Sequence, residues 1–265
     1  MMIKNKWYNY KNHFRLFEVV FDKLRIISKN IFSISWIDTI RINSKLPFKQ
    51  FVKMPIFLYG SKIDMLNGTI CIQNDIVTTG MIHLGQRTSG FCGSKNGIFI
   101  SISGGAIFKG PGYMGNNSVI EIGKNGTITF GRNFGITGAF KIASHSRINI
   151  GDNFSSSWDV GIYDTDFHFM ENVGTHMKSK LTIPITIGDD CWICQRCLIL
   201  KGSYLPQRSI LASCSLLNAS YKNISPNTIY AGTPARPIKE GWTREEFIRF
   251  EKYPIGNIVK QLGLQ

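Results

Sequence analysis

The sequence predicts a mainly β protein built as a solenoid of six-residue repeats, and three observations support this. An aliphatic residue recurs at every sixth position, at Ile187, Ile193, Ile199, Leu205, Leu211 and Leu217. A small residue follows four positions after each of the first five, at Cys191, Cys197, Ser203, Ser209 and Ser215. A period of six fits neither an isolated helix nor an isolated strand, but it is typical of a hexapeptide β-helix. Three repeats would close one triangular coil, so we expect Ile187 to stack on Leu205, Ile193 on Leu211 and Ile199 on Leu217.

A looser form of the repeat extends the predicted solenoid to residues 55–240. Hydrophobic-x-hydrophobic-Gly recurs at Ile82–Gly85, Ile120–Gly123, Ile128–Gly131, Ile148–Gly151 and Ile185–Gly188. We therefore expect irregular early coils and regular late ones. Residues 167–186 show little of the repeat, and long insertions in compact domains tend to be functional or disordered.

The two ends of the chain predict helices. Residues 12–32 carry an amphipathic pattern through Phe14, Phe17, Phe21, Leu24, Ile27 and Ile31. This helix, in a basic N-terminal segment 1–54, is expected to cap the open solenoid or to attach to an anionic membrane face, and the two roles are compatible. Within segment 241–265, Thr243-Arg244-Glu245-Glu246 has capping-box spacing, which predicts a helix to about Tyr253.

Charge and composition narrow the function classes. The net charge is +14, and residues 1–53 hold eleven Lys and Arg against three acids, a net of +8. This excess indicates an anionic partner: nucleic acid, a membrane surface or a phosphorylated cofactor. Nucleic acid ranks low because no recognised module is present. No apolar run is long enough to span a membrane, a signal-peptide pattern is absent, and six cysteines fit a reducing compartment. We expect a cytoplasmic protein, with the inner membrane face as a second possibility.

His168 is the candidate catalytic residue. Counting repeats from Ile150 leads through Ser156 and Ile162 to position 168, where the regular coil gives way to the insertion. A rigid scaffold would hold this histidine while leaving it open to a ligand. Asp164 and Asp166 lie close by and could orient the imidazole, so that it accepts a proton near neutral pH.

Two motifs could bind a metal ion, but the sequence does not favour a metal site at either. The Asp164-x-Asp166 pair could bind a divalent ion, but no nucleotide-binding βαβ unit accompanies it. The string Cys191-x-x-Cys194-x-x-Cys197 looks like a metal or iron–sulfur motif. The repeat places Cys191 and Cys197 at different corners of the triangle, so a packing role is favoured. Five histidines, by number and spacing, do not suggest a zinc site of three converging ligands.

The late repeats and the segment after them carry a family resemblance. Ile187-Gly188-Asp189-Asp190-Cys191-Trp192-Ile193, Ser225-Pro226-Asn227 and the run from Ala231 to Lys239 resemble the C-terminal half of hexapeptide-repeat acyltransferases. The resemblance implies a left-handed parallel β-helix and a homotrimer with active sites between subunits. Residues 155–158 and 164–168 are similar to O-acetyltransferases of bacterial capsule and surface polysaccharides.

The resemblance also assigns roles to residues. It makes His168 the catalytic base, with Asp166 and Asp164 beside it, and makes acetyl-CoA the donor. Residues expected at the coenzyme are Trp192, Gln195, Ala212, Cys214, Thr233, Arg236 and Lys239. Ala212 and Cys214 stand where relatives usually have glycine, which narrows the track expected for the pantetheine arm. Trp158 and Tyr163 are expected at the substrate.

The sequence thus predicts an acetyl-CoA-dependent O-acetyltransferase that modifies a sugar hydroxyl of a surface glycan or its precursor. Two alternatives stay open. One is N-acetylation of an amino sugar on a nucleotide, and the other is a non-catalytic trimeric scaffold.

Overall fold

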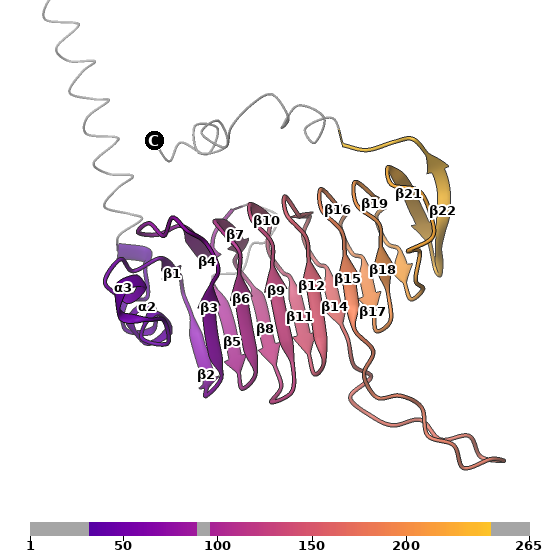
Figure 1. Cartoon of the computed structure of the whole chain (residues 1–265), viewed down its shortest axis with the longest axis horizontal. Coiled ribbons are helices and arrows are strands. Elements are labelled where there is room, and N and C mark those ends of the chain that lie inside the picture. Colours follow the sequence, from indigo (N-terminus) through magenta and orange to yellow (C-terminus); the bar gives the residue numbers. More distant parts are fainter. Residues whose placement is uncertain (1–31, 89–95, 245–265) are drawn as a thin grey trace, which may run out of the picture.

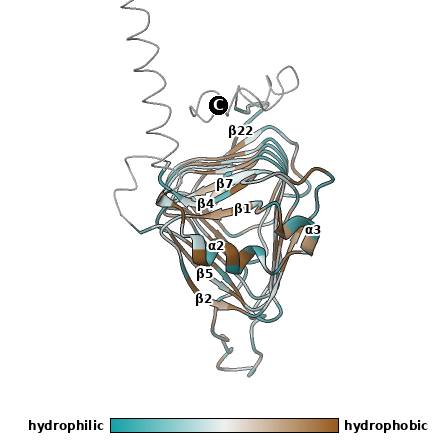
Figure 2. Ribbon diagram, turned by 90° about the vertical axis from the view of Figure 1, so that its left-hand side faces the viewer, coloured by the Kyte–Doolittle hydropathy of each residue, from teal (hydrophilic) through white to brown (hydrophobic). Residues whose placement is uncertain are grey.

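The computed structural model describes residues 32–88 and 96–244 (Figure 1). Apart from Phe32, the predicted N-terminal helix lies outside these residues, and so does the predicted C-terminal helix beyond Arg244. The described chain is the predicted left-handed parallel β-helix. Figure 2 looks along its axis and shows three sheet faces around one interior.

The coils pass through the three sheets in a fixed order. The nine-stranded sheet consists of β1 (Ile56–Leu58), β4 (Ile82–Gln86), β7 (Gly112–Gly115), β10 (Phe134–Ile136), β13 (Ser155–Ser156), β16 (Trp192–Ile193), β19 (Ile210–Leu211), β21 (Thr228–Gly232) and β22 (Ala235–Glu240). The seven-stranded sheet consists of β2 (Lys62–Leu66), β5 (Ile98–Ile102), β8 (Ser118–Ile122), β11 (Lys141–Ser144), β14 (Gly161–Tyr163), β17 (Leu198–Leu200) and β20 (Leu216–Leu217). The six-stranded sheet consists of β3 (Thr69–Ile72), β6 (Gly105–Phe108), β9 (Thr127–Phe130), β12 (Arg147–Ile150), β15 (Ile185–Ile187) and β18 (Tyr204–Leu205).

Three columns of turns join these sheets. The first corner leads from the nine-stranded to the seven-stranded sheet, the second corner from the seven-stranded to the six-stranded sheet, and the third corner back to the nine-stranded sheet. Each coil therefore crosses all three corners once, and equivalent turns of successive coils lie above one another.

The predicted aliphatic stacking is confirmed. Ile187 pairs with Leu205, Ile193 with Leu211, and Ile199 with Leu217, and every one of these side chains is at most 1% exposed. The small residues expected at the corners are all buried: Cys191, Cys197, Ser203, Ser209 and Ser215. Inward side chains of one coil rest on those of the next, so the burial of each layer depends on its neighbours.

The early coils are less regular, as the weaker repeat predicted. A register shift between Ile63 and Met65 interrupts the pairing of β2 with β5. Another, between Leu84 and Gln86, interrupts the pairing of β4 with β7. Aromatic residues fill part of the interior in the coils that follow. The rings of Phe108 and Phe130 stack with centroids 5.2 Å apart.

Helix α2 (Trp36–Asn43) closes the first coil, and the short helix α3 (Phe48–Phe51) follows it. The Asn43 amide donates to the Ile56 carbonyl at 2.7 Å, and its oxygen accepts the Ile56 N–H at 3.1 Å. The Thr39 hydroxyl oxygen accepts the Leu58 N–H at 3.0 Å. An open edge strand exposes unpaired backbone groups, and α2 satisfies several of those on β1. The capping helix predicted from the sequence, residues 12–32, lies earlier in the chain than α2.

The other end of the solenoid closes with a hairpin. Strand β22 runs antiparallel to β21 and completes the nine-stranded sheet. The insertion leaves the solenoid between β14 and β15 as an arm (Figure 1). Antiparallel bridges join Thr165 to Thr182 and Glu171 to Lys178 along this arm. Ile185 and Thr186, the end of the predicted insertion, belong to β15.

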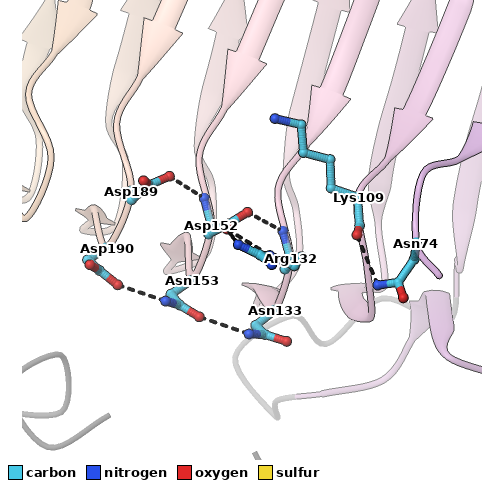
Figure 3. Close-up of polar contacts among 8 residues, drawn as sticks. All are labelled: Asn74, Lys109, Arg132, Asn133, Asp152, Asn153, Asp189 and Asp190. Atoms are coloured by element: carbon cyan, nitrogen blue, oxygen red, sulfur yellow. Dashed lines mark hydrogen bonds and ion pairs between the residues drawn. The ribbon is translucent and has the colours of Figure 1, made fainter. Parts of the chain in front are cut away.

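A polar column runs along the third corner (Figure 3). The Asn133 amide donates to the Asn153 oxygen at 3.0 Å, and the Asn153 amide donates to Asp190 at 2.9 Å. The Asp152 carboxylate binds the Arg132 guanidinium at 2.6 Å, and this contact raises the pKa of Arg132. These side chains bind coil to coil, so we assign this column to stability.

Candidate active site

His168 lies just past the second corner, at the base of the inserted arm, and it is exposed. The turn before it is fixed by three contacts. The Thr165 hydroxyl oxygen accepts the Phe167 N–H at 3.0 Å, and Phe167 has a φ of 61°. The Phe167 ring packs edge-on against His145, at 5.6 Å, and against Tyr163, at 6.4 Å. A solvent-accessible imidazole thus follows a backbone that the buried Thr165 and the half-buried His145 and Tyr163 hold in place.

Asp164 is fully buried and binds the preceding coil. Its carboxylate accepts the Ser144 hydroxyl at 2.7 Å, the His145 N–H at 2.7 Å and the Ser146 N–H at 3.0 Å. It therefore holds the second corner together. Its predicted role beside the imidazole of His168 stays a prediction.

Asp166 pairs with Lys201 of the next coil and donates its backbone N–H to Leu181 at 3.1 Å. These contacts anchor the base of the arm on both sides. Within the described residues neither Asp166 nor Asp164 has a hydrogen bond to His168, and their contacts join the turn before His168 to the neighbouring coils.

Four of the predicted ligand-contacting residues lie together at the first corner. The Trp158 carbonyl accepts the Arg196 N–H at 3.2 Å, and the Gln195 carbonyl accepts the Cys214 N–H at 3.0 Å. The Thr233 hydroxyl donates to the Cys214 carbonyl at 3.5 Å. Trp158, Gln195, Cys214 and Thr233 therefore form one column across four coils.

Ala212 and Cys214 show how this corner is built without glycine. Ala212 donates its N–H to the Tyr230 carbonyl at 2.8 Å. Cys214 adopts a φ of 59°, a conformation that usually favours glycine, and its side chain is exposed. The side chain stands outward on the track expected for the pantetheine arm.

Trp192 faces outward from the nine-stranded sheet, one strand residue before the first corner. It pairs with Ser155 on one side and Ile210 on the other. The Arg244 guanidinium lies 5.2 Å from the Trp192 ring centroid and donates to the Ser155 hydroxyl at 2.8 Å. The chain after β22 thus returns across this sheet and places a cation on the predicted coenzyme wall.

Sequence reasoning missed this role of Arg244. The residue was noticed only as part of the capping-box pattern that begins at Thr243. A local pattern carries no information about a sheet that lies several coils back, so no sequence signal indicated the contact with Trp192.

The two predicted phosphate-binding cations lie on β22. The Arg236 guanidinium donates to the Tyr221 hydroxyl at 3.2 Å, and the Lys239 ammonium lies 3.4 Å from the Trp242 ring centroid. Both side chains are exposed. Their positive charge is available to an anionic ligand at the end of the solenoid.

The two residues predicted to contact the substrate, Trp158 and Tyr163, lie at different corners of the solenoid. Trp158 lies at the first corner, while Tyr163 lies near the second corner beside Phe167. Burial, and secondarily the Asp159 carboxylate, raises the pKa of Tyr163, so its hydroxyl stays protonated at neutral pH. Asp159 and Asp164 are five residue steps apart, which at the rise of a strand is at most roughly 17 Å. The residues of the first corner and His168 therefore lie at different corners of one chain.

The cysteine string is packed as expected. The fully buried Cys191 thiol donates to the Pro206 carbonyl at 3.0 Å, and the Cys197 thiol donates to the Ala212 carbonyl at 3.1 Å. Burial raises the pKa of Cys191 to about 12 and that of Cys197 to about 11.

Over residues 32–88 and 96–244, no three His, Cys, Asp or Glu side chains are grouped to hold a metal ion. In the same ranges no helix has the length and apolarity needed to cross a membrane.

The known proteins that this chain is similar to include acetyltransferases. No family model matches the chain. Galactoside O-acetyltransferase of Escherichia coli (strain K12) is 28% identical over 162 residues, covering 61% of this chain and 74% of that protein. A putative acetyltransferase of Saccharomyces cerevisiae is 29% identical, covering 41% of this chain and 63% of that protein. Among solved structures, the polySia specific acetyltransferase NeuO has a TM-score of 0.46 at 17% identity, over 69% of this chain and 82% of that one.

The structure thus combines a six-residue repeat, a parallel β-helix and an exposed histidine at its interrupted corner. At 28% identity the chain is similar to galactoside O-acetyltransferase, in line with the resemblance to hexapeptide-repeat acyltransferases that its sequence carries.

Proposed function

We propose that this protein transfers an acetyl group from acetyl-CoA to a sugar hydroxyl, with His168 as the general base. The single observation that carries the proposal is the position of His168. It is exposed, it directly follows a turn fixed by Thr165 and Phe167, and it stands where the regular coil is interrupted. A histidine so held is suited to accept a proton from a bound hydroxyl.

The chemistry needs one base and one set of oxyanion donors. The His168 imidazole takes the proton of the acceptor hydroxyl while that oxygen attacks the thioester carbonyl. The tetrahedral oxyanion is stabilised by hydrogen-bond donors such as backbone N–H groups. When the carbon–sulfur bond breaks, the imidazolium returns the proton to the thiolate, which leaves free coenzyme A and an acetyl ester.

The donor would lie along the first corner. Trp192, Gln195, Ala212, Cys214 and Thr233 supply a continuous wall over successive coils, and Arg236 and Lys239 supply exposed cations for the coenzyme phosphates. Arg244 adds a third cation over Trp192. Acetyl-CoA is anionic, and Arg236, Lys239 and Arg244 place three cations beside this wall. The residues present therefore fit the coenzyme.

The acceptor class rests on the relative that acts on a galactoside. We propose a glycan, and specifically a surface polysaccharide or its precursor, with Trp158 and Tyr163 at the acceptor. Attachment to a membrane face would involve residues 12–32, outside the described residues, and stays a prediction.

We also propose that the working form is a homotrimer, because one chain does not bring its two groups of site residues together. The second corner of one copy would meet the first corner of its neighbour. The outer face of the seven-stranded sheet, which lies between these corners, carries half-buried Val119, Leu198 and Leu216. The inserted arm also exposes large apolar residues: Phe167, Phe169, Met170, Val173 and Met177. A second copy would cover these apolar surfaces.

The test is release of free thiol from acetyl-CoA in the presence of candidate glycans. His168→Ala should abolish acceptor-dependent release. His176→Ala is a matched control, because His176 lies on the same arm, is exposed and pairs with Glu171 at 2.9 Å. This control should retain activity.

Equal rates for wild type and His168→Ala would refute the role of this histidine. A product whose acetyl group survives mild alkali would indicate an amide and therefore N-acetylation. Absence of transfer with every acceptor, in a stable trimer, would favour the scaffold.

A further inference from the structure

A groove of about 470 Å³ lies on the outer face of the six-stranded sheet, away from the candidate active site. Its floor is one row of outward side chains in register: Thr129 on β9, Asn149 on β12, Thr186 on β15 and Tyr204 on β18. A turn that contains Lys222, Ile224 and Pro226 forms one wall. The groove therefore follows the solenoid axis over several coils.

The polar groups of this row are free to bind a ligand. Within residues 32–88 and 96–244, the side chains of Thr129, Asn149, Thr186 and Tyr204 form no hydrogen bond. The neighbouring third corner is different, because Asn133 and Asn153 there bind one another from coil to coil (Figure 3). Two polar columns lie side by side, and only the corner column is used internally.

Lysines stand at the two ends of the row. Lys109 follows β6 and Lys222 follows the coil beyond β18, so the ends are separated by five strand spacings, about 24 Å. Figure 3 shows the Lys109 side chain extending from its corner toward the following coils. Neither ammonium has an ion-pair partner among the described residues. The acid on the rim, Asp189, already accepts the Asp152 N–H at 2.7 Å.

We propose that this groove is an accessory binding site for a linear anionic glycan. Hydroxyl and amide groups both donate and accept hydrogen bonds, as sugar hydroxyls require. The half-buried Tyr204 ring offers an apolar surface to a sugar ring, and the end lysines pair with carboxylates or phosphodiesters. The inference rests on the proposed function in that the glycan is the acceptor polymer.

The location of the groove suits a second binding site for the same acceptor polymer. The groove lies on a different face from the seven-stranded sheet that we assign to the subunit interface, so assembly through that sheet leaves the groove open. A polymer held in the groove is kept near the catalytic site, which raises the effective acceptor concentration. Nucleic acid fits less well, because the row offers one aromatic ring and two widely spaced cations.

The test is direct binding of fluorescent oligosaccharides to the full-length protein at low salt. An oligogalacturonide supplies carboxylates, an oligomeric glycerol phosphate supplies phosphodiesters, and a malto-oligosaccharide is the neutral control. The double variant Lys109→Ala/Lys222→Ala and the blocking variant Asn149→Trp should each weaken binding of the preferred anionic probe by about tenfold or more. Lys124→Ala, which removes an exposed lysine at the second corner, should bind like wild type.

Acetyl transfer separates this inference from the proposed function. The groove variants should raise KM for a polymeric acceptor and leave transfer to a monosaccharide unchanged. Loss of transfer with intact glycan binding would overturn only the proposed function. The groove is refuted if no anionic probe binds, if all variants bind like wild type, or if an oligonucleotide binds there more tightly. Thermal melting of each variant checks that it is folded.

Discussion

Two inactive variants should restore activity to each other when mixed, if the active site is shared between subunits. The first variant is His168→Ala, which removes the base at the second corner. The second is Cys214→Trp, which places a bulky ring on the first corner. Cys214 is already a non-glycine residue at a φ of 59° and its side chain is exposed, so the added ring should extend into solvent rather than into the core, and the fold should be retained.

The expected magnitude follows from the geometry. The two groups of residues are separated by one edge of the triangle, roughly 17 Å of extended chain, so an intact site needs the second corner of one copy and the first corner of another. In trimers assembled at random from equal amounts of the two variants, each of these contributions is intact in half of the cases. About one quarter of the sites, and about one quarter of the wild-type rate, should return.

The assay requires subunit exchange, so the two variants are unfolded together, refolded and compared with each variant refolded alone. Thiol release from acetyl-CoA reports activity, and light scattering reports the oligomeric state. If the mixed trimers stay as inactive as the separate variants, the reasoning that places the site between subunits is wrong.

Three further predictions concern stability and are checked by urea denaturation. Ile193→Ala removes a fully buried side chain that stacks on Leu211, which should cost about 3–4 kcal/mol; a loss below about 1 kcal/mol would contradict the ladder. Asn43→Ala leaves the N–H and carbonyl of Ile56 without their partners and should cost about 2–4 kcal/mol; an unchanged midpoint would rule out edge capping by α2. The folded Cys191 thiol has a pKa of about 12 against an ordinary 9.0, so only the unfolded chain releases this proton between those values. The free energy of unfolding should therefore fall as pH rises from about 9 to about 12. The fall should be less steep in Cys191→Ser. Equal slopes of unfolding free energy against pH in the two proteins would exclude the Cys191 thiol as the cause.

The repeat was predictable from the sequence because it is a local property. The six-residue spacing of Ile187, Ile193 and Ile199 sets which side chains face inward, and stacking on Leu205, Leu211 and Leu217 follows from three repeats per coil. The column through Gln195 and Cys214 follows from the same count. Counting also located His168 at the interruption.

The partners of polar side chains were not predictable in this way. Proximity in sequence paired Asp164 with His168, yet the buried carboxylate binds Ser144 and two N–H groups one coil earlier. Coil-to-coil contacts join residues about twenty positions apart, and a hydrogen bond forms with whichever donor the neighbouring coil presents. The same reason explains why α2 as an edge cap was missed.

The solenoid, its corners and the candidate base could all be predicted from residue spacing, because each depends on positions along one chain. The tertiary structure alone decided that His168 and the first corner lie apart, that Arg244 returns over Trp192, and that a row from Thr129 to Tyr204 stays free for a ligand. These features depend on which coils lie side by side and which groups are already paired, and folding in three dimensions sets both.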